Sequence, residues 1–328
     1  MIQSVTITNY LGSLNDNLAK QTNQNTVHIT LKDDEPSHGM LIMSITGLGP
    51  VKATINRTEL ATTDGSLYNS AKLEERNIVI KIKFLEAKSI EDVRLLTYKY
   101  FPIKRKVIFS IKTDNRDARA IGYIESNEPD IFSKDECADI SIICPDPYFY
   151  SNFAGDSPHI IQFSGLEDEF EFPFDNNSLT ENLIELGNIQ PIVTKDFLYQ
   201  GDQEIGVTMN IDFMNNVDTD FTVYHYKSSF NPNEPELMSG FLIKADKLHA
   251  LMGTYFLSGD RVTVETTQGN EHIFLIRNGV SHNILNAVTR DSDWFKLAKG
   301  SNRFIFTAYG NESKLNFRIE NYVIYEGV

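Results

Sequence analysis

Carboxylates are the side chains with possible chemistry that cluster most clearly in this sequence. The run 167–171 (EDEFE) could supply oxygen ligands for calcium or a pair of groups for acid–base catalysis. Consecutive residues of a strand point to opposite faces, so this run cannot easily converge on one ion, and we predict a solvated strand edge or loop. The segments 201–204 (GDQE) and 258–260 (SGD) are typical of turns in which aspartate accepts hydrogen bonds from nearby backbone amides.

Nucleophiles and metal ligands show no recognisable arrangement. The two cysteines, Cys137 and Cys144, lie near isoleucines, which predicts buried free thiols rather than a disulfide framework. The sequence has no Cys-x-x-Cys, and its seven histidines show no His-x-x-x-His spacing, so structural zinc is not expected. A P-loop and a Gly-x-Ser-x-Gly elbow are absent as well. We therefore predict no catalytic, cofactor-binding or metal-binding residues, and no enzyme.

The chain is acidic, and its charge is unevenly spread. It has 30 Lys and Arg against 45 Asp and Glu, which argues against nucleic acid as a partner because phosphate binding needs a positive surface. Residues 1–150 carry 18 basic and 20 acidic residues, whereas residues 151–328 carry 12 and 25, which favours a domain boundary near 150. The single basic cluster, 104–106 (KRK) with Lys99 and Lys112 nearby, predicts an exposed strand end or an interface with an acidic neighbour.

Four aromatic residues could stack on sugar rings, as aromatic side chains do in lectins. Trp294 is the only tryptophan, and Tyr224, Tyr226 and Tyr255 are weaker candidates on the same logic. Trp294 lies in the pattern 293–297 (DWFKL), which predicts a short helix that presses Trp294 or Leu297 onto a sheet. Core packing is therefore the favoured interpretation for Trp294, with glycan binding as the alternative.

Alternating apolar and polar residues predict strands throughout both halves, most clearly at 77–84 (NIVIKIKF). One amphipathic helix is predicted between Ser89 and Pro102, where acidic residues occupy the first turn. A second short helix is predicted over 291–297, and a single helical turn at 133–136. Many short strands separated by turn residues indicate antiparallel sandwiches.

These patterns predict a mainly β protein with two β-sandwich domains, the first with an added α-helix. The expected division is 1–150, a linker or first strand at 151–172, and a second domain at 173–328. No apolar run approaches the ~20 residues needed to span a bilayer. The first residues lack the basic and apolar regions of a signal peptide, so we expect a cytoplasmic site of synthesis and no membrane insertion.

Several short segments, in order, resemble one known family. They are 47–48 (GL), 64–65 (DG), 76–80 (RNIVI), 90–93 (IEDV), 113–116 (TDNR), 121–125 (IGYIE), 128–133 (EPDIFS) and 140–149 (ISIICPDPYF). Together they resemble the N-terminal domain of bacteriophage distal tail proteins over roughly residues 1–150. The second half is similar, more loosely, to the galectin-like, jelly-roll sandwich of this family, at 201–206 (GDQEIG), 258–266 (SGDRVTVET) and 294–302 (WFKLAKGSN).

The resemblance implies a structural virion protein that forms a hexameric ring, the hub that joins the phage tail tube to the tail tip or baseplate and the host-adsorption apparatus. The implied partners are further copies of the chain, the tail tube protein, the tape-measure protein and tail-tip or receptor-binding proteins. The implied location is the tail tip of the virion, assembled in the cytoplasm of the host bacterium. The alternative is a carbohydrate-binding module that recognises host cell-surface polysaccharide through the second domain.

Overall fold

The computed structural model describes most of the 328 residues. The described ranges are 1–10, 24–29, 31, 39–59, 64–85, 89–130, 132, 135–152, 159–164, 166–167, 188–189, 193–227, 236–267 and 269–328. The chain divides into two compact units, one made of Met1–Asp156 with Ile324–Val328 and the other of Ser157–Val323. Each unit is described by itself below.

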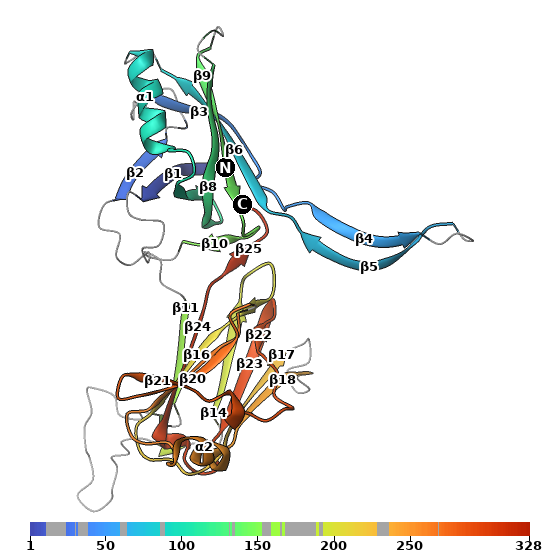
Figure 1. The fold of residues 1–328 in the computed structure, drawn as a ribbon, viewed down its shortest axis with the longest axis vertical. Coiled ribbons are helices and arrows are strands. Elements are labelled where there is room, and N and C mark those ends of the chain that lie inside the picture. The colour runs from blue at the N-terminus through green and yellow to red at the C-terminus, as the bar shows by residue number, and fades with distance from the viewer. Residues whose placement is uncertain are drawn as a thin grey trace, which may run out of the picture. The chain divides into compact units, whose positions relative to one another are not determined.

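The first unit contains a nine-stranded antiparallel sheet, a helix and a separate hairpin (Figure 1). Its elements are β1 Ile2–Tyr10, β2 Gln24–Ile29, β3 Met40–Thr46, β4 Ala53–Glu59, β5 Ser66–Leu73, β6 Arg76–Phe84, α1 Ile90–Tyr100, β7 Lys106–Thr113, β8 Asp117–Asp130, β9 Cys137–Cys144, β10 Phe149–Ser151 and β25 Ile324–Tyr325. The sheet order is β2-β1-β7-β8-β9-β6-β3, and β10 pairs with both β8 and β25.

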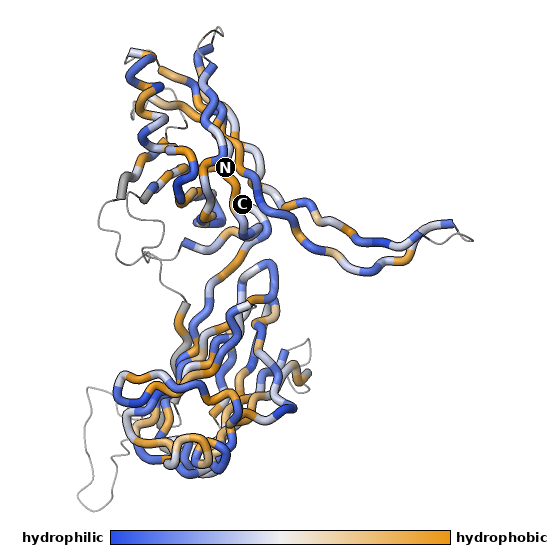
Figure 2. Tube along the Cα trace, viewed as in Figure 1, coloured by the Kyte–Doolittle hydropathy of each residue, from blue (hydrophilic) through white to orange (hydrophobic). Residues whose placement is uncertain are grey.

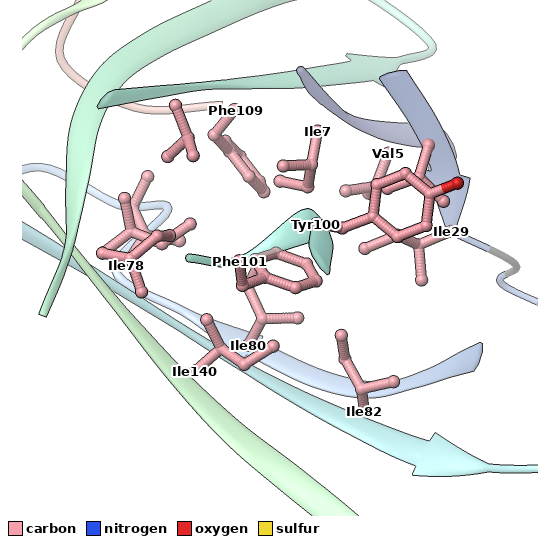
Figure 3. Packing of buried hydrophobic residues seen from close by; sticks show 14 of the residues in the cluster. Val5, Ile7, Ile29, Ile78, Ile80, Ile82, Tyr100, Phe101, Phe109 and Ile140 are labelled. Atoms are coloured by element: carbon pink, nitrogen blue, oxygen red, sulfur yellow. The ribbon is translucent and has the colours of Figure 1, made fainter. Parts of the chain in front are cut away.

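The sheet bends so that the strands near its two ends share one core with the helix. Alternate residues of β6 are buried, as the period-two pattern predicts, and they meet buried residues of β1. Phe101, which directly follows α1, is fully buried and lies among the side chains of Ile7, Ile78 and Ile80 (Figure 3). The end of the helix therefore closes the bent sheet into a sandwich-like body.

Two strands continue beyond this body as a hairpin arm, defined here as β4 and β5. The paired strands β3 and β6 belong to the body, whereas β4 and β5 pair with each other and with no other strand of the described residues. Gly47 marks the root of the arm: its φ is +84°, and a Cβ there would lie 2.0 Å from the carbonyl oxygen of Asn77. Only glycine permits this close backbone approach.

The end of the chain returns to the first unit. β25 pairs with β10, and the backbone N–H of Val328 donates to the carbonyl oxygen of Leu48 at 3.0 Å. The buried Arg76 donates to the carbonyl oxygen of Glu326 at 2.6 Å. Residues 324–328 were assigned to the second domain from the sequence, and the structure places them in the first unit. No local pattern in five residues reveals this pairing, because it joins positions about 175 residues apart in sequence.

The second unit is a sandwich of two antiparallel sheets. Their orders are β11-β24-β16-β19-β20-β21 and β14-β23-β17-β18. The elements are β11 His159–Ser164, β12 Leu166–Glu167, β13 Asn188–Ile189, β14 Val193–Tyr199, β15 Ile205–Gly206, β16 Thr208–Phe213, β17 Phe221–Lys227, β18 Glu236–Ile243, α2 Ala245–Met252, β19 Arg261–Glu265, β20 His272–Arg277, β21 Val280–Asn283, η2 Leu285–Ala287, β22 Lys296–Leu297, β23 Gly300–Thr307, η3 Glu312–Lys314 and β24 Leu315–Asn321. Aromatic rings join the sheets: the centroids of Phe306 and Phe317 are 3.6 Å apart.

The structure confirms a mainly β chain with sandwich domains, and it confirms the helix after Ser89 as α1. The short helix predicted over 291–297 is wrong: this segment starts in a turn, bonds to the edge of β18 at Asp293, and ends in β22. The helical turn predicted at 133–136 lies largely outside the described residues. Helix α2 was missed, although Gly253 ends it in the left-handed conformation typical of a helix C-terminus.

Candidate functional site: an exposed hairpin arm and a basic pocket

Both predicted turn aspartates make structural contacts: Asp202 lies 3.8 Å from the Nζ of Lys299, and Asp260 stabilises its own turn. Asp260 is 3% exposed and accepts a hydrogen bond from the backbone N–H of Leu257 at 2.8 Å, which confirms the predicted role in the turn. Its carboxylate also accepts two bonds from Arg277, from Nε at 2.9 Å and from Nη2 at 2.5 Å. These bonds raise the pKa of the Arg277 guanidinium. Of the acidic run 167–171, only Glu167 lies within the described residues.

Metal and thiol chemistry find no support among the described residues. None of their His, Cys, Asp and Glu side chains form a group of three or more that could hold a metal ion. Cys137 and Cys144 are both buried free thiols on β9, as predicted. Burial raises the pKa of the Cys144 thiol to about 12, so it remains protonated and unreactive at neutral pH.

A buried histidine in the second unit is held in one tautomer. Asn302 donates through Nδ2 to the carbonyl oxygens of Ala298 and Gly300, which fixes its Oδ1 as an acceptor. The Nε2 of His225 lies 2.8 Å from that oxygen and must therefore carry the proton. Its Nδ1 lies 3.4 Å from the hydroxyl of Ser239. Desolvation by burial lowers the pKa of His225, more than the Asn302 bond raises it. This neutral imidazole forms a side-chain hydrogen bond between the neighbouring strands β17 and β23.

The arm exposes apolar side chains that a protein normally covers. Every residue of β5 is exposed, and six of seven in β4 are. Ile55, Leu67 and Tyr68 are 60%, 55% and 68% exposed. The arm extends away from the sheet of the first unit (Figure 1), and apolar positions recur along it (Figure 2). An isolated two-stranded hairpin is marginally stable in water, and exposed apolar side chains on such an element are typical of an interaction surface.

The root of the arm is fixed by one buried arginine. Arg76 is 1% exposed, and its guanidinium lies 4.3 Å from the centroid of the Phe149 ring. It donates to the carbonyl oxygens of Gly47 at 2.5 Å and Gly49 at 2.8 Å, and to that of Pro147 at 2.8 Å. With its bond to residue 326, Arg76 ties the start of the arm, the turn before β10 and the chain end together. No sequence pattern predicts this role for Arg76.

The predicted basic cluster does not form a compact patch. Lys104 and Arg105 are exposed in the turn before β7, while Lys106 is half-buried. Lys99 lies on α1, with its Nζ 5.5 Å from the centroid of the Tyr100 ring. The exposed strand end that the sequence indicated is therefore what the structure shows, and the interface interpretation remains a prediction.

The four aromatic glycan candidates lie on different surfaces. Tyr224 and Tyr226 lie on β17, with ring centroids 6.4 Å apart, on the face opposite the buried Val223 and His225. Tyr255 follows α2 and contacts another aromatic side chain, with a centroid distance of 4.5 Å to the ring of His249.

Trp294 differs from the favoured prediction. It is 36% exposed rather than buried in the core, while its neighbours Phe295 and Leu297 are fully buried. The reason is that 294–297 is not helical: Trp294 and Lys296 are exposed and alternate with the buried Phe295 and Leu297, as side chains do along a strand.

Trp294 lines a pocket at the edge of the second sheet. This basic pocket has a volume of about 380 Å³, within the range of small-molecule sites. Its lining includes Phe241, Lys247, Asn286, Arg290 and Trp294. Phe241 is buried, and its ring centroid is 6.5 Å from that of Trp294.

Comparisons with known proteins bear on the fold. No family model matches the sequence, and no curated protein sequence matches it significantly. A solved structure described as the SPP1 Dit protein, "a Paradigm of Hub Adsorption Apparatus in Gram-positive Infecting Phages", matches with a TM-score of 0.55 and 11% identity, over 86% of this chain and 93% of that chain. A chain of the phage P2 baseplate matches over 98% of both chains at 13% identity, but its TM-score of 0.43 is too low to support a shared fold. The resemblance to distal tail proteins is therefore confirmed at the level of fold: this chain is built like the Dit protein of phage SPP1.

Proposed function

We propose that the chain is a structural subunit of a phage tail tip, with no enzymatic activity. In this proposal the first unit assembles into a ring of six copies, which forms the hub between the tail tube and the tail tip or baseplate. Its partners are further copies of itself, the tail tube and tape-measure proteins, and the tail-tip or receptor-binding proteins of the host-adsorption apparatus. The protein is assembled in the host cytoplasm and resides in the virion. The fold shared with the SPP1 Dit protein supports this role.

The hairpin arm is the observation that carries the proposal. A ring requires head-to-tail contacts, in which one surface of each copy meets a different surface of the next. The arm supplies one such surface, because it offers apolar side chains on both faces of two strands that have no other cover among the described residues. Fully burying a large apolar side chain contributes roughly 1.5–3 kcal/mol, so the three apolar residues of the arm supply part of the free energy that offsets the cost of association.

Native mass spectrometry of the full chain tests the ring at tens of micromolar protein. We expect a hexamer in the wild type, and smaller species in a Leu67→Glu/Tyr68→Glu variant that places charge on both faces of the arm. Leu198→Glu is the matched control, because Leu198 is 60% exposed on β14 of the second unit and should leave the hexamer intact.

Two outcomes count against the proposal. Wild-type protein that remains monomeric, with no rings in negative-stain images, argues against self-assembly of the chain on its own. A hexamer that persists in the arm variant leaves the ring standing but shows that the arm does not form it.

A further inference from the structure

The basic pocket stands out by the sign of its charges. The second half of the chain has 12 basic and 25 acidic residues, yet the only ionisable side chains that line this pocket are Lys247 and Arg290. The neighbouring Asp291 and Asp293 are exposed and do not line it. A local pair of cations within an acidic domain indicates a site for a ligand that carries negative charge or is rich in acceptors.

The pocket is held open by backbone contacts rather than by a mobile loop. Segment 287–293 runs beside β18: the N–H of Thr289 donates to the carbonyl oxygen of Leu242 at 3.1 Å, and the N–H of Asp293 donates to that of Gly240 at 2.9 Å. The hydroxyl of Ser292 accepts from the N–H of Leu242 at 3.0 Å. These bonds occupy the outer edge of β18 and fix the residues on either side of Arg290 and Trp294. Such preorganisation lowers the entropy cost of binding.

The free groups of the pocket fit a sugar. Trp294 is 36% exposed and rests against the buried Phe241, so part of its indole surface faces the pocket and can stack on the apolar face of a pyranose ring. The ammonium of Lys247 donates one hydrogen bond to the carbonyl oxygen of Val288, at 3.4 Å, and has two further N–H donors for the ligand. The guanidinium of Arg290 can form a bidentate hydrogen bond to a carboxylate or phosphate. Asn286 adds an amide for hydroxyl groups.

We propose that this pocket binds a saccharide unit that carries a negative charge, either a uronic acid or a sugar phosphate. Trp294 stacks on the ring, and Lys247 and Arg290 hold the anionic substituent. The second unit then acts as a carbohydrate-binding module for an acidic cell-surface polysaccharide, the alternative function that the sequence suggested. This binding does not require ring formation, so its failure and the failure of the hub proposal are distinguishable.

The sole tryptophan makes the test specific. Because Trp294 is the only one in the chain, its fluorescence reports on this pocket alone. We expect glucuronic acid or glucose 6-phosphate to change the emission of the full-length protein saturably, and glucose to bind about tenfold more weakly, a difference of about 1.4 kcal/mol. The comparison of the two acidic sugars distinguishes a carboxylate from a phosphate as the preferred group.

Variants assign the contacts by saturation-transfer NMR, which does not depend on the tryptophan. Arg290→Ala should weaken binding of the acidic sugar up to about fivefold without affecting that of glucose. Trp294→Ala should abolish detectable binding, and Trp294→Phe should retain part of it. Lys299→Ala is the control, because this exposed lysine lies near in sequence but does not line the pocket.

Three results would overturn the proposal. If neither acidic sugar binds at tens of millimolar, the pocket is not a saccharide site. Equal binding of glucose and glucuronic acid, unaffected by Arg290→Ala, removes the role of charge. Inorganic phosphate that binds as tightly as glucose 6-phosphate, with no loss in Trp294→Ala, makes the pocket an anion site without a sugar.

Discussion

Replacing Arg76 by methionine should destabilise the first unit and leave the second unchanged. Methionine keeps much of the side-chain volume against the Phe149 ring but removes every donor. The carbonyl oxygens of Gly47, Gly49, Pro147 and Glu326, which accept part-buried hydrogen bonds from Arg76, then lose this partner.

The magnitude follows from these four bonds. Each of these hydrogen bonds contributes roughly 1 kcal/mol net, so the variant should lose about 4 kcal/mol of unfolding free energy. A domain has about 5–15 kcal/mol in total, so this loss is a large fraction of the stability of the first unit. With a slope of about 2 kcal/mol per molar urea, the midpoint of unfolding should fall by about 2 M.

The two units can be followed separately in one urea titration. Trp294 lies in the second unit and is the only tryptophan, so its fluorescence follows that unit, while far-UV circular dichroism follows both. We expect Arg76→Met to shift the circular-dichroism transition of the first unit and to leave the fluorescence midpoint in place. Arg94→Met is the control, because the ion pair of Arg94 with Glu91 lies on the exposed side of α1. A loss below about 0.5 kcal/mol, the scale of an ordinary surface substitution, or equal shifts in both signals, would refute the reasoning.

Two further predictions concern the second unit, and Trp294 fluorescence measures both. Asp260→Ala should cost roughly 3 kcal/mol, because a carboxylate that is 3% exposed loses three hydrogen bonds, one from the N–H of Leu257 and two from Arg277. Asp212→Ala, which breaks a more exposed pair, should cost far less, and similar losses in the two variants would contradict this. The pKa of His225 is lower in the folded protein than the ordinary histidine value of 6.5, so the unfolded state binds a proton first as the pH falls. The free energy of unfolding should therefore be constant above about pH 7.5. Below pH 6.5 it should fall by up to ~1.4 kcal/mol per pH unit until the folded pKa is reached. His225→Gln should flatten this dependence between pH 7.5 and 5.5, and an unchanged slope in that window would count against the buried neutral imidazole.

The sequence by itself determined the local elements. The alternation of Ile78, Ile80 and Ile82 predicted a half-buried strand, and the acidic start and the proline after the pattern predicted helix α1; both are present. Such signals are reliable because one strand face or one helix stripe must be apolar wherever the element is placed. The resemblance to distal tail proteins depended on the same kind of local segment.

Tertiary structure decided which surfaces stay open. Strand alternation cannot tell whether an apolar face meets a core or solvent, and the apolar residues of the arm are exposed only because β4 and β5 pair with each other and with no other strand. Trp294 was expected in the core, but residues 287–293 bond to the edge of β18 and form no helix, which leaves the indole at a pocket. The hydrogen bonds of Arg76 and the pairing of β25 with β10 likewise join positions far apart in the sequence. Exposure depends on pairings between residues far apart in the chain, which no local pattern encodes.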